Sequence, residues 1–542
     1  MHISGIWKHF LKANSFARAS PLTFFNMIDN KEKDWFKLKR YPHIGFPLNN
    51  IDRSKWIERY VTNPSNISKH SFLPFIHKTS RVKKFRKSYN SKDGSLNDEF
   101  ILDNKVLRKA DEKKRELFYA SHLDSLIFSY YAFILSQKYE EKIHKFHLND
   151  VVNAYRAVPI NPDKEDSSNK CNIDFANDVF NYISNYEEQE FAVIAFDISS
   201  FFDNLDHKIL REIWAVILDA EKLPPDHFNV YKNITRFSHV DIVDIFEEFK
   251  DKIYTQKTTI KGVPLDVKQK KIDNIRYLRN QNAIAFCTEK EFFKVKGKLL
   301  QPSKSKKLED GTKIYRNFGI PQGSPISSVL ANIYLLHFDI VINNFITNNG
   351  NIGIYRRYSD DMVVVCPLEL KEELIKLVNE EIKKYKLDIQ SKKTQIFQFK
   401  REGSKLICGQ DFESGVNWNK NFIYLGFEFD GENVLLKSSS ISGFYRKMKR
   451  AIKRAKYFSS IKYSKTKGDL FKRRLLKKYS YKGAKRIRKY IWNEKEKKFI
   501  KTDSYNWGNF LSYTNKAAKV FSDNKIKQQT KRHWNIINKL LK

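Results

Sequence analysis

The chain has 542 residues, 41% of them hydrophobic and 14% aromatic, which is enough for about two to four folding units with real cores. This composition excludes a chain that is disordered as a whole. One hundred Lys and Arg against 62 Asp and Glu give a net charge of +38, which favours a polyanionic partner such as nucleic acid.

The four cysteines are scattered and form no CxxC pair, which argues against a zinc site and against a disulfide framework. The N-terminus lacks the apolar run of a signal peptide, and the most apolar helical stretch, residues 125–135, is too short to span a bilayer. We therefore expect a cytoplasmic protein without a membrane partner.

The N-terminal third mixes loops with one long helix. Three Pro or Gly residues within 41–47 favour a compact loop, and the basic stretch 81–94 predicts a linker or an exposed hairpin. Between residues 113 and 143 apolar side chains recur at three- and four-residue spacing. This period predicts a buried amphipathic helix with Asp124 near its start.

Residues 191–202 form a short apolar run around one acid, Asp197, and their Val, Ile and Phe content predicts a buried strand. Asp206 is placed to cap a helix that begins near His207. Residues 240–316 are rich in Lys and Asp, and their periodicity is broken too often to predict any element.

The segment GIPQGSP at 319–325 predicts a tight loop, because two glycines and two prolines fix its backbone. The elements expected after it are a helix that runs through residues 332 and 338 and two strands, 354–358 and 362–365, that flank Ser359-Asp360-Asp361. A second helix over 368–385 and a strand over 394–399 are expected next.

The last section, residues 441–542, has helical spacing and carries 32 Lys and Arg against five Asp and Glu. It therefore holds +27 of the net charge of +38. Three of its tryptophans, Trp492, Trp507 and Trp534, are expected in a core rather than as stacking platforms for bases.

Three acidic residues are candidate metal ligands. An Asp inside an apolar strand, such as Asp197, is costly unless a partner such as a cation balances its charge. Asp360 and Asp361 lie at a tight turn between two apolar strands. Taken singly, Asp197 is more often a structural acid, and Ser-Asp-Asp is more often a solvated turn. Together they suit two Mg²⁺ ions about 4 Å apart, which catalyse phosphoryl transfer from a nucleoside triphosphate.

The order of five motifs resembles the reverse-transcriptase family, firmly over about residues 191–430 and loosely over about 110–160. The segments that look like palm motifs A to E are FDISSFFDNLDH at 196–207, GIPQGSPISSVLANIYLLHFD at 319–339, RYSDDMVVV at 357–365, Lys392-Lys393-Thr394 and YLGF at 424–427. The resemblance implies an α+β right-hand polymerase. The implied parts are an N-terminal extension (1–100), fingers (101–190), a ferredoxin-like palm (191–435) with an insertion at about 208–316, and a basic α-helical thumb with a C-terminal extension (436–542).

The resemblance also implies a role for each residue that matches a motif. Asp197 and Asp360 would be the direct metal ligands, with the Ile198 carbonyl completing a site and Asp361 supporting them. The implied cofactors are two Mg²⁺ ions, for which Mn²⁺ can substitute. Lys393 is implied to protonate or neutralise the leaving pyrophosphate.

Nucleotide and primer contacts follow from the same resemblance. Phe202 matches an aromatic steric gate that excludes a ribose 2′-OH, although a core aromatic is the alternative and is expected for Phe201. Gln322 and Gly323 belong to the loop that packs under the incoming nucleotide.

In the fingers, Arg115 and Arg156 are the best matches for triphosphate contacts, because Arg offers a bidentate fork. The alternative for each is a plain surface ion pair. Tyr424, Leu425 and Gly426 look like the primer grip.

The implied activity is RNA-directed DNA polymerisation, with an RNA template, a DNA product and dNTPs as partners. The YSDD turn, the insertion between motifs A and B, and a thumb without a VTG-type sequence are most similar to bacterial defence-associated and abortive-infection reverse transcriptases. That subgroup implies antiphage defence and a cognate non-coding RNA. The alternatives are a retron or group II intron-type enzyme, an RNA-synthesising polymerase, and a non-catalytic RNA-binding scaffold on the same fold.

Overall fold

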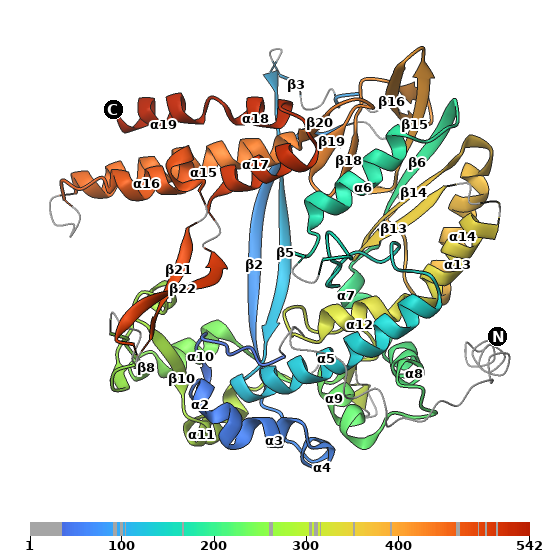
Figure 1. Cartoon of the computed structure of the whole chain (residues 1–542). Coiled ribbons are helices and arrows are strands. Elements are labelled where there is room, and N and C mark those ends of the chain that lie inside the picture. Colours follow the sequence, from blue (N-terminus) through green and yellow to red (C-terminus); the bar gives the residue numbers. More distant parts are fainter. Residues whose placement is uncertain are drawn as a thin grey trace.

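The computed structural model describes residues 35–542, apart from short internal gaps. The residues outside the described part are 1–34, 90–94, 98–100, 103–104, 165–166, 260–263, 303–305, 308–312, 315, 349, 351–352, 391–392, 462–466, 486, 494–495 and 506–507. Helices and mostly antiparallel sheets form an α+β fold, which confirms the expected fold class. In Figure 1 the central sheet lies at the upper right, with a helical layer below it and a helical arm that extends to the upper left.

A six-stranded antiparallel sheet forms the centre of the molecule, in the order β13-β14-β6-β15-β16-β17. Its strands are β6 (Glu190–Asp197), β13 (Ile354–Tyr358), β14 (Asp361–Pro367), β15 (Gln395–Glu402), β16 (Lys405–Phe412) and β17 (Gly415–Asn417). The strands predicted around Asp197, on both sides of the Ser-Asp-Asp turn and over 394–399 are therefore confirmed.

Both faces of this sheet are covered, which explains why β6 is apolar between its two terminal acids, Glu190 and Asp197. Side chains alternate along a strand, so Ala192 and Ile194 enter one core while Phe191 and Val193 enter another. The first core is completed by α5 (His122–Lys145), α8 (His207–Ile217), α9 (Pro225–Thr235), α12 (Ser327–Tyr334), α13 (Leu336–Asn348) and α14 (Lys371–Lys384). The second core is completed by α6 (Asn172–Ser184), α17 (Phe510–Val520) and the small sheet β18 (Phe422–Tyr424), β19 (Phe427–Phe429) and β20 (Val434–Leu436).

One predicted helix cap, Asp206, is confirmed, and the predicted start of the long helix is corrected. Asp206 accepts hydrogen bonds from the backbone N–H groups of Lys208 and Ile209, so it caps α8 as predicted. The helix expected over 113–143 begins only at His122, with Ser121 capping it through the backbone N–H of Asp124. Residues before it form β5 (Lys109–Tyr119) instead.

Strand β5 pairs along its whole length with β2 (Phe75–Arg86), and the two form a long antiparallel ribbon. Figure 1 shows this ribbon running from the lower helical layer toward the upper arm. It confirms the hairpin alternative for the first part of the basic stretch 81–94. Residues 113–119 were expected to be helical because their few apolar side chains precede the apolar period of α5 without a break.

The segment without a sequence prediction, 240–316, builds a second, smaller unit. Its strand β7 (His239–Asp241) pairs with β2, and its sheet includes a strand from the N-terminal region. The elements are β1 (His43–Ile44), β8 (Ile253–Thr255), β9 (Lys268–Lys270), β10 (Ala283–Cys287), α10 (Ile242–Phe249) and α11 (Glu289–Leu299). Strand β1 is a correction, because only a loop was expected over 41–47.

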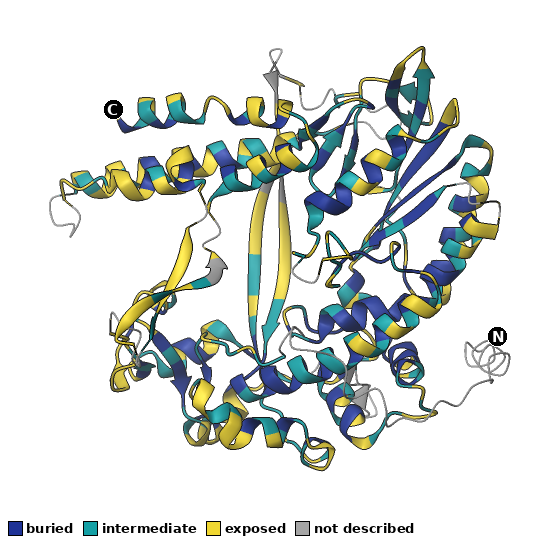
Figure 2. Cartoon of the chain, in the orientation of Figure 1, coloured by how far each residue is buried: buried dark blue, intermediate teal, exposed yellow. Residues whose placement is uncertain are grey.

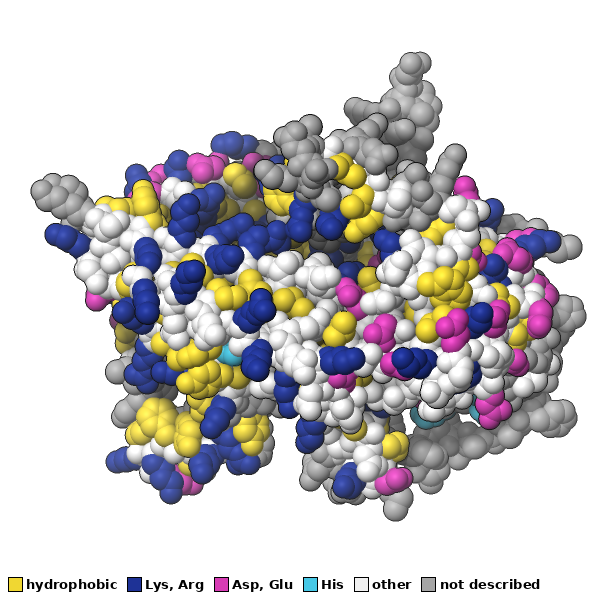
Figure 3. All heavy atoms as spheres, turned by 90° about the horizontal axis from the view of Figure 1, so that it is seen from above, with side chains coloured by type: hydrophobic (Ala, Val, Ile, Leu, Met, Phe, Trp, Pro, Cys, Tyr) yellow, Lys and Arg dark blue, Asp and Glu magenta, His cyan; other side chains and the backbone are white. Residues whose placement is uncertain are grey.

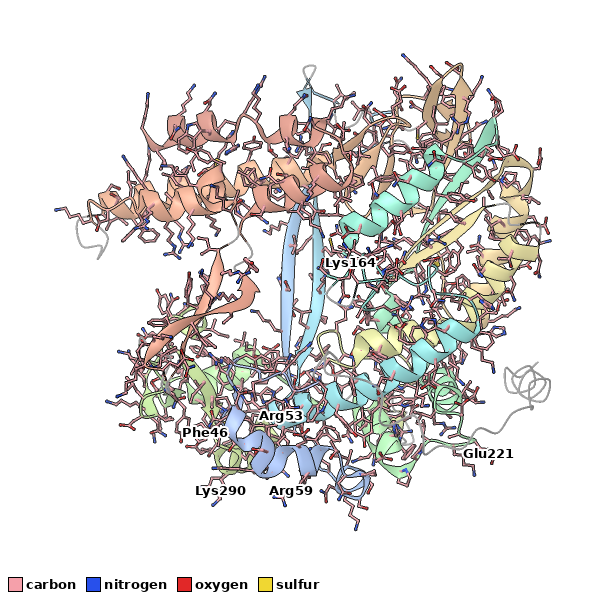
Figure 4. All side chains as sticks on the ribbon, viewed as in Figure 1. Phe46, Arg53, Arg59, Lys164, Glu221 and Lys290 are labelled. Carbon is pink, nitrogen blue, oxygen red and sulfur yellow. The ribbon has the colours of Figure 1, made fainter. Side chains whose placement is uncertain are left out.

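The N-terminal region packs on this smaller unit. The Gly45 N–H donates to the Cys287 carbonyl over 2.9 Å, and the Phe46 ring meets Tyr254 edge-on. Figure 4 places Phe46, Arg53 and Lys290 in the same lower corner of the molecule. The remaining short elements are α2 (Asn50–Asp52), α3 (Glu58–Val61), α4 (Pro64–Ser68), α7 (Phe201–Asn204), β3 (Ile101–Leu102), β4 (Lys105–Val106), β11 (Lys306–Lys307) and β12 (Lys313–Ile314).

The C-terminal arm is helical except for one hairpin. Its helices, besides α17, are α15 (Ser438–Ser460), α16 (Lys472–Tyr479), α18 (Lys525–Thr530) and α19 (His533–Leu541). The expectation of helices throughout is wrong for β21 (Arg488–Asn493) and β22 (Lys498–Tyr505), which project from the arm (Figure 1). Trp534 packs against the core of the arm as expected, Trp492 lies on the hairpin, and Trp507 is outside the described residues.

Charge is distributed unevenly over the surface. Seen from above, Lys and Arg are frequent over the side that holds the arm, and Asp and Glu gather mainly on the opposite side (Figure 3). Within the described residues, no single helix has the length and hydropathy needed to cross a membrane, although the bent pair α12–α13 meets both criteria together. The division into fingers, palm and thumb stays an interpretation of this arrangement.

Candidate active site

Three carboxylates meet at one end of the central sheet. Asp197 is the last residue of β6, and Asp361 is the first residue of β14 directly opposite it in the ladder. Asp360 lies in the turn just before β14, and its carbonyl accepts a hydrogen bond from the Ile198 N–H over 3.3 Å. The two adjacent strands thus bring together acids that are more than 160 residues apart in sequence.

The three carboxylates lie close enough together for their negative charges to repel one another. The pKa of Asp361 is raised to about 6 by desolvation and by the charges of Asp360 and Asp197, while Lys393 and Lys437 act in the opposite direction. The Lys393 ammonium lies 2.8 Å from Asp197 Oδ1. The expected motif D lysine is therefore in contact with the expected motif A acid.

The donor chemistry of this site suits a hard divalent cation. Carboxylate oxygens are the ligands that Mg²⁺ prefers. The pKa of Asp361 is raised by burial first and then by repulsion from Asp360 and Asp197, and a cation would relieve that repulsion. In the described part of the chain, no three His, Cys, Asp or Glu side chains are already arranged to hold a metal ion. Asp197 is engaged by Lys393 instead.

A buried ion pair supports the turn that carries Asp360. The Arg357 guanidinium is fully buried, and its Nη2 and Nε atoms lie 2.6 and 2.8 Å from the two carboxylate oxygens of Asp339. The Arg357 Nη1 donates to the Ser359 carbonyl over 3.3 Å. Burial alone lowers the pKa of Arg357, but the Asp339 carboxylate outweighs it and holds that pKa above its usual value.

The sequence predictions missed this ion pair, although both residues lie inside the quoted motifs. The available signal was a pair of arginines, Arg356 and Arg357, inside a short predicted strand. The turn itself is strained, because Ser359 has φ 64 and is not glycine. The Tyr155 hydroxyl lies 3.3 Å from Ser359 Oγ, so a residue from the expected fingers also contacts the turn.

The predicted nucleotide loop, 319–325, is held by backbone hydrogen bonds from two directions. The Phe118 N–H of β5 donates to the Gln322 carbonyl over 2.8 Å, and the Ile320 N–H donates to the Phe202 carbonyl over 2.9 Å. Phe201 is buried in the core as expected, whereas Phe202 beside it is only partly buried. The loop therefore links the Phe202 segment to the long ribbon.

Gly323 is needed at its position for two reasons, and we expect Gly323→Ala to loosen this loop. Its φ of 112 disfavours any L side chain, and a Cβ would lie 2.7 Å from the Phe118 carbonyl oxygen. The cost should be about 1–3 kcal/mol, which accelerates hydrogen exchange of the Phe118 amide about tenfold or more. The measurement is hydrogen exchange of peptides that span 115–119.

Gly403→Ala is the matched control, because Gly403 also has a positive φ but its Cβ would meet no atom within 4 Å. It should leave exchange at Phe118 unchanged. Equal exchange in the Gly323→Ala variant and the unmodified protein would show that the loop tolerates a side chain there.

The predicted primer grip is a two-residue turn between β18 and β19. Leu425 (φ 45) and Gly426 (φ 94) occupy the left-handed region, as this hairpin turn requires. The Gly426 carbonyl accepts from the Lys437 N–H over 3.1 Å, at the start of α15. Burial and the Asp361 carboxylate both raise the pKa of Tyr424, so this turn lies beside the acids.

The two predicted triphosphate contacts have different positions. Arg115 is exposed on β5, three residues or about 10 Å along the strand from Phe118. Arg156 is not free to reach a triphosphate here, because its guanidinium pairs with the Glu140 carboxylate over 2.6 Å and donates to two backbone carbonyls. Its position corresponds to the ion-pair alternative.

Residues 273–429 match the family model described as reverse transcriptase (RNA-dependent DNA polymerase). The matched range includes the nucleotide loop, the Ser-Asp-Asp turn, Lys393 and the Tyr424 turn, and it begins after Asp197. The match covers less than half of the chain, and over these residues the chain is similar to the reverse-transcriptase family.

No curated protein matches the chain. Among solved structures, it is similar to apo telomerase from Candida tropicalis, with 14% identity, a TM-score of 0.31, and coverage of 77% of this chain and 60% of that chain. It is also similar to telomerase from Candida albicans in complex with the TWJ fragment of telomeric RNA, with 14% identity, a TM-score of 0.30, and coverage of 73% and 52%. The chain thus spans between 52% and 60% of the length of these telomerase chains.

Proposed function

We propose that this protein is an RNA-directed DNA polymerase that joins dNTPs by two-metal phosphoryl transfer. The observation that carries the proposal is the meeting of Asp197, Asp360 and Asp361 at one sheet end, beside Lys393 and the reverse-transcriptase motifs. An ordinary solvent-exposed turn does not require two paired strands and a buried ion pair to fix the positions of its acidic side chains.

In this mechanism Asp197 and Asp360 would hold two Mg²⁺ ions, or Mn²⁺ in their place, with the Ile198 carbonyl and Asp361 in support. When bound, the ions supply Lewis acidity at the attacking 3′-hydroxyl and at the departing pyrophosphate. Lys393 contacts Asp197, a position from which its ammonium can donate a proton to the pyrophosphate.

Around these acids the other site residues position the substrates. The loop that contains Gln322 and Gly323 lies under the nucleotide, and the turn at Tyr424, Leu425 and Gly426 holds the primer end. Arg115 is the remaining candidate for a triphosphate contact from the expected fingers.

The test is dNTP incorporation by the purified chain with Mg²⁺, on a primed RNA template, on a primed DNA template and without template. Incorporation that requires the RNA template is expected, and Asp360→Asn should reduce it about a thousandfold. No incorporation under any of the three conditions would favour the RNA-binding scaffold, and incorporation without template would overturn RNA-directed synthesis.

Replacing Phe202 by Ala should weaken the discrimination between dNTPs and NTPs. The ring is partly buried, and the Phe202 carbonyl accepts a hydrogen bond from the nucleotide loop, so in this proposal removing the ring makes room for a 2′-OH. We expect the ratio of kcat/KM for dNTP over NTP to fall about tenfold to a hundredfold. Phe202→Tyr keeps the ring and should keep the ratio. An unchanged ratio in Phe202→Ala would instead place Phe202 among the core aromatics.

We further propose that the polymerase acts in the bacterial cytoplasm in antiphage defence, with a cognate non-coding RNA. The YSDD turn and the long segment between motifs A and B support this subgroup over a retron or group II intron-type enzyme. Phage challenge of cells that carry the unmodified gene or Asp360→Asn tests it. Equal phage resistance in both would contradict a defence role for DNA synthesis.

A further inference from the structure

The hairpin β21–β22 exposes large aromatic side chains on a basic segment. Tyr490 is 52% exposed and Phe499 is 51% exposed, although both are residues that usually lie in cores. Figure 2 shows β21 as exposed over most of its length. Residues 488–505 contain six Lys or Arg and three Asp or Glu. One of the lysines, Lys498, is paired with Glu496 over 2.9 Å.

The aromatic residues lie on one face of this hairpin. Tyr490 is opposite Lys501, and Trp492 is opposite Phe499. Because side chains alternate along a strand, these four residues share a face, while Ile491 and Ile500 share the other. The Trp492 and Phe499 rings are 5.1 Å apart in a T-shaped arrangement. We call Tyr490, Trp492, Phe499 and Lys501 the aromatic face.

Such a face has the properties of a surface that binds unpaired nucleotides. Contiguous exposed apolar side chains mark interaction surfaces, and an isolated two-stranded hairpin is only marginally stable without further contacts. Flat rings stack on bases, and the excess of basic residues attracts phosphates. A duplex would not use the rings, since its bases are stacked on each other.

We propose that the aromatic face binds single-stranded template RNA, with bases stacked on Tyr490 and Phe499 and a phosphate near Lys501. The choice of RNA rests on the proposed function, because the template is then the strand that is unpaired before it is copied. The hairpin projects from the arm away from the central sheet (Figure 1), so it binds RNA without entering the catalytic site.

The test uses the full chain and measures fluorescence anisotropy with three labelled probes: single-stranded oligouridine RNA, single-stranded oligothymidine DNA and a blunt RNA–DNA duplex. The double variant Tyr490→Leu with Phe499→Leu keeps apolar bulk on the strands and removes two rings. We expect its affinity for the RNA to fall about tenfold or more, and its affinity for the duplex to change less than about twofold.

Ile491→Ala is the matched control, because Ile491 is 54% exposed on the opposite face of the same strand. It should bind the RNA like the unmodified protein. Unchanged RNA affinity in the leucine variant, or an equal loss in Ile491→Ala, would overturn the proposal. The single-stranded DNA should lose affinity about as much as the RNA, because ring stacking and phosphate attraction do not distinguish the two sugars. A loss for the duplex as large as that for the RNA would overturn the assignment to unpaired strands.

The outcome is separable from that of the proposed polymerase activity. Asp360→Asn should lose dNTP incorporation and keep full RNA affinity, whereas the leucine variant should lose RNA affinity. If the unmodified protein incorporated no dNTP but its RNA affinity still depended on the two rings, the proposed function would fail and the binding face would stand.

Discussion

Replacing Asp360 by Asn is expected to reduce dNTP incorporation about a thousandfold, with little change in RNA affinity. The amide keeps the shape of the side chain but removes the negative charge that a divalent cation needs. Metal-assisted charge stabilisation contributes several kcal/mol to such a reaction, and each 1.4 kcal/mol is about tenfold in rate. The measurement is single-turnover extension of a primed RNA template.

Asp361→Asn should have a smaller effect, about tenfold, because this residue is proposed to support the site rather than to bind the metal directly. Glu402→Gln is the control, since Glu402 is an exposed acid at the far end of β15 in the same sheet. Equal losses in Asp360→Asn and Asp361→Asn would remove the distinction between the two acids. Near-normal extension by Asp360→Asn would contradict the two-metal mechanism itself.

The candidate catalytic acids and the strands of the central sheet that carry them could be predicted because each is marked by a short sequence pattern. An eight-residue apolar strand that ends in Asp197, and two strands that flank Asp360, can each be identified within about ten residues of sequence. The order of the motifs then implied that these segments meet, and the ladder between β6 and β14 places Asp361 opposite Asp197. The cap at Asp206 was equally local.

The rest could not be predicted because it depends on partners that are distant in sequence. Strand β1 pairs with β10, and β2 pairs with β7, so neither segment 41–47 nor segment 240–316 shows its strands locally. Arg156 lies in a segment that resembles a family motif, but in the folded chain its guanidinium pairs with Glu140 and donates to two backbone carbonyls. The short hairpin β21–β22 interrupts a helical pattern without a Pro or Gly in either strand.

Replacing Arg357 by Met is expected to destabilise the protein by about 3–5 kcal/mol, because it leaves the Asp339 carboxylate buried and unpaired. Both side chains are fully buried, and the Tyr355 hydroxyl donates to the same carboxylate over 2.8 Å. The measurement is thermal denaturation, with Lys138→Met as the control. Lys138 pairs with Glu141 at the surface, so its loss should cost less than about 1 kcal/mol.

The double variant Arg357→Met with Asp339→Leu separates stability from positioning. Removing both charges leaves no unpaired buried group, so much of the lost stability should return. The Ser359 carbonyl still lacks the donor that Arg357 provides, and the strained turn that carries Asp360 is then held less firmly. We therefore expect kcat for dNTP incorporation to stay about tenfold low in a protein whose stability has recovered. Recovery of both quantities together would show that the ion pair only stabilises the core, and that the turn keeps its geometry without the Arg357 hydrogen bond.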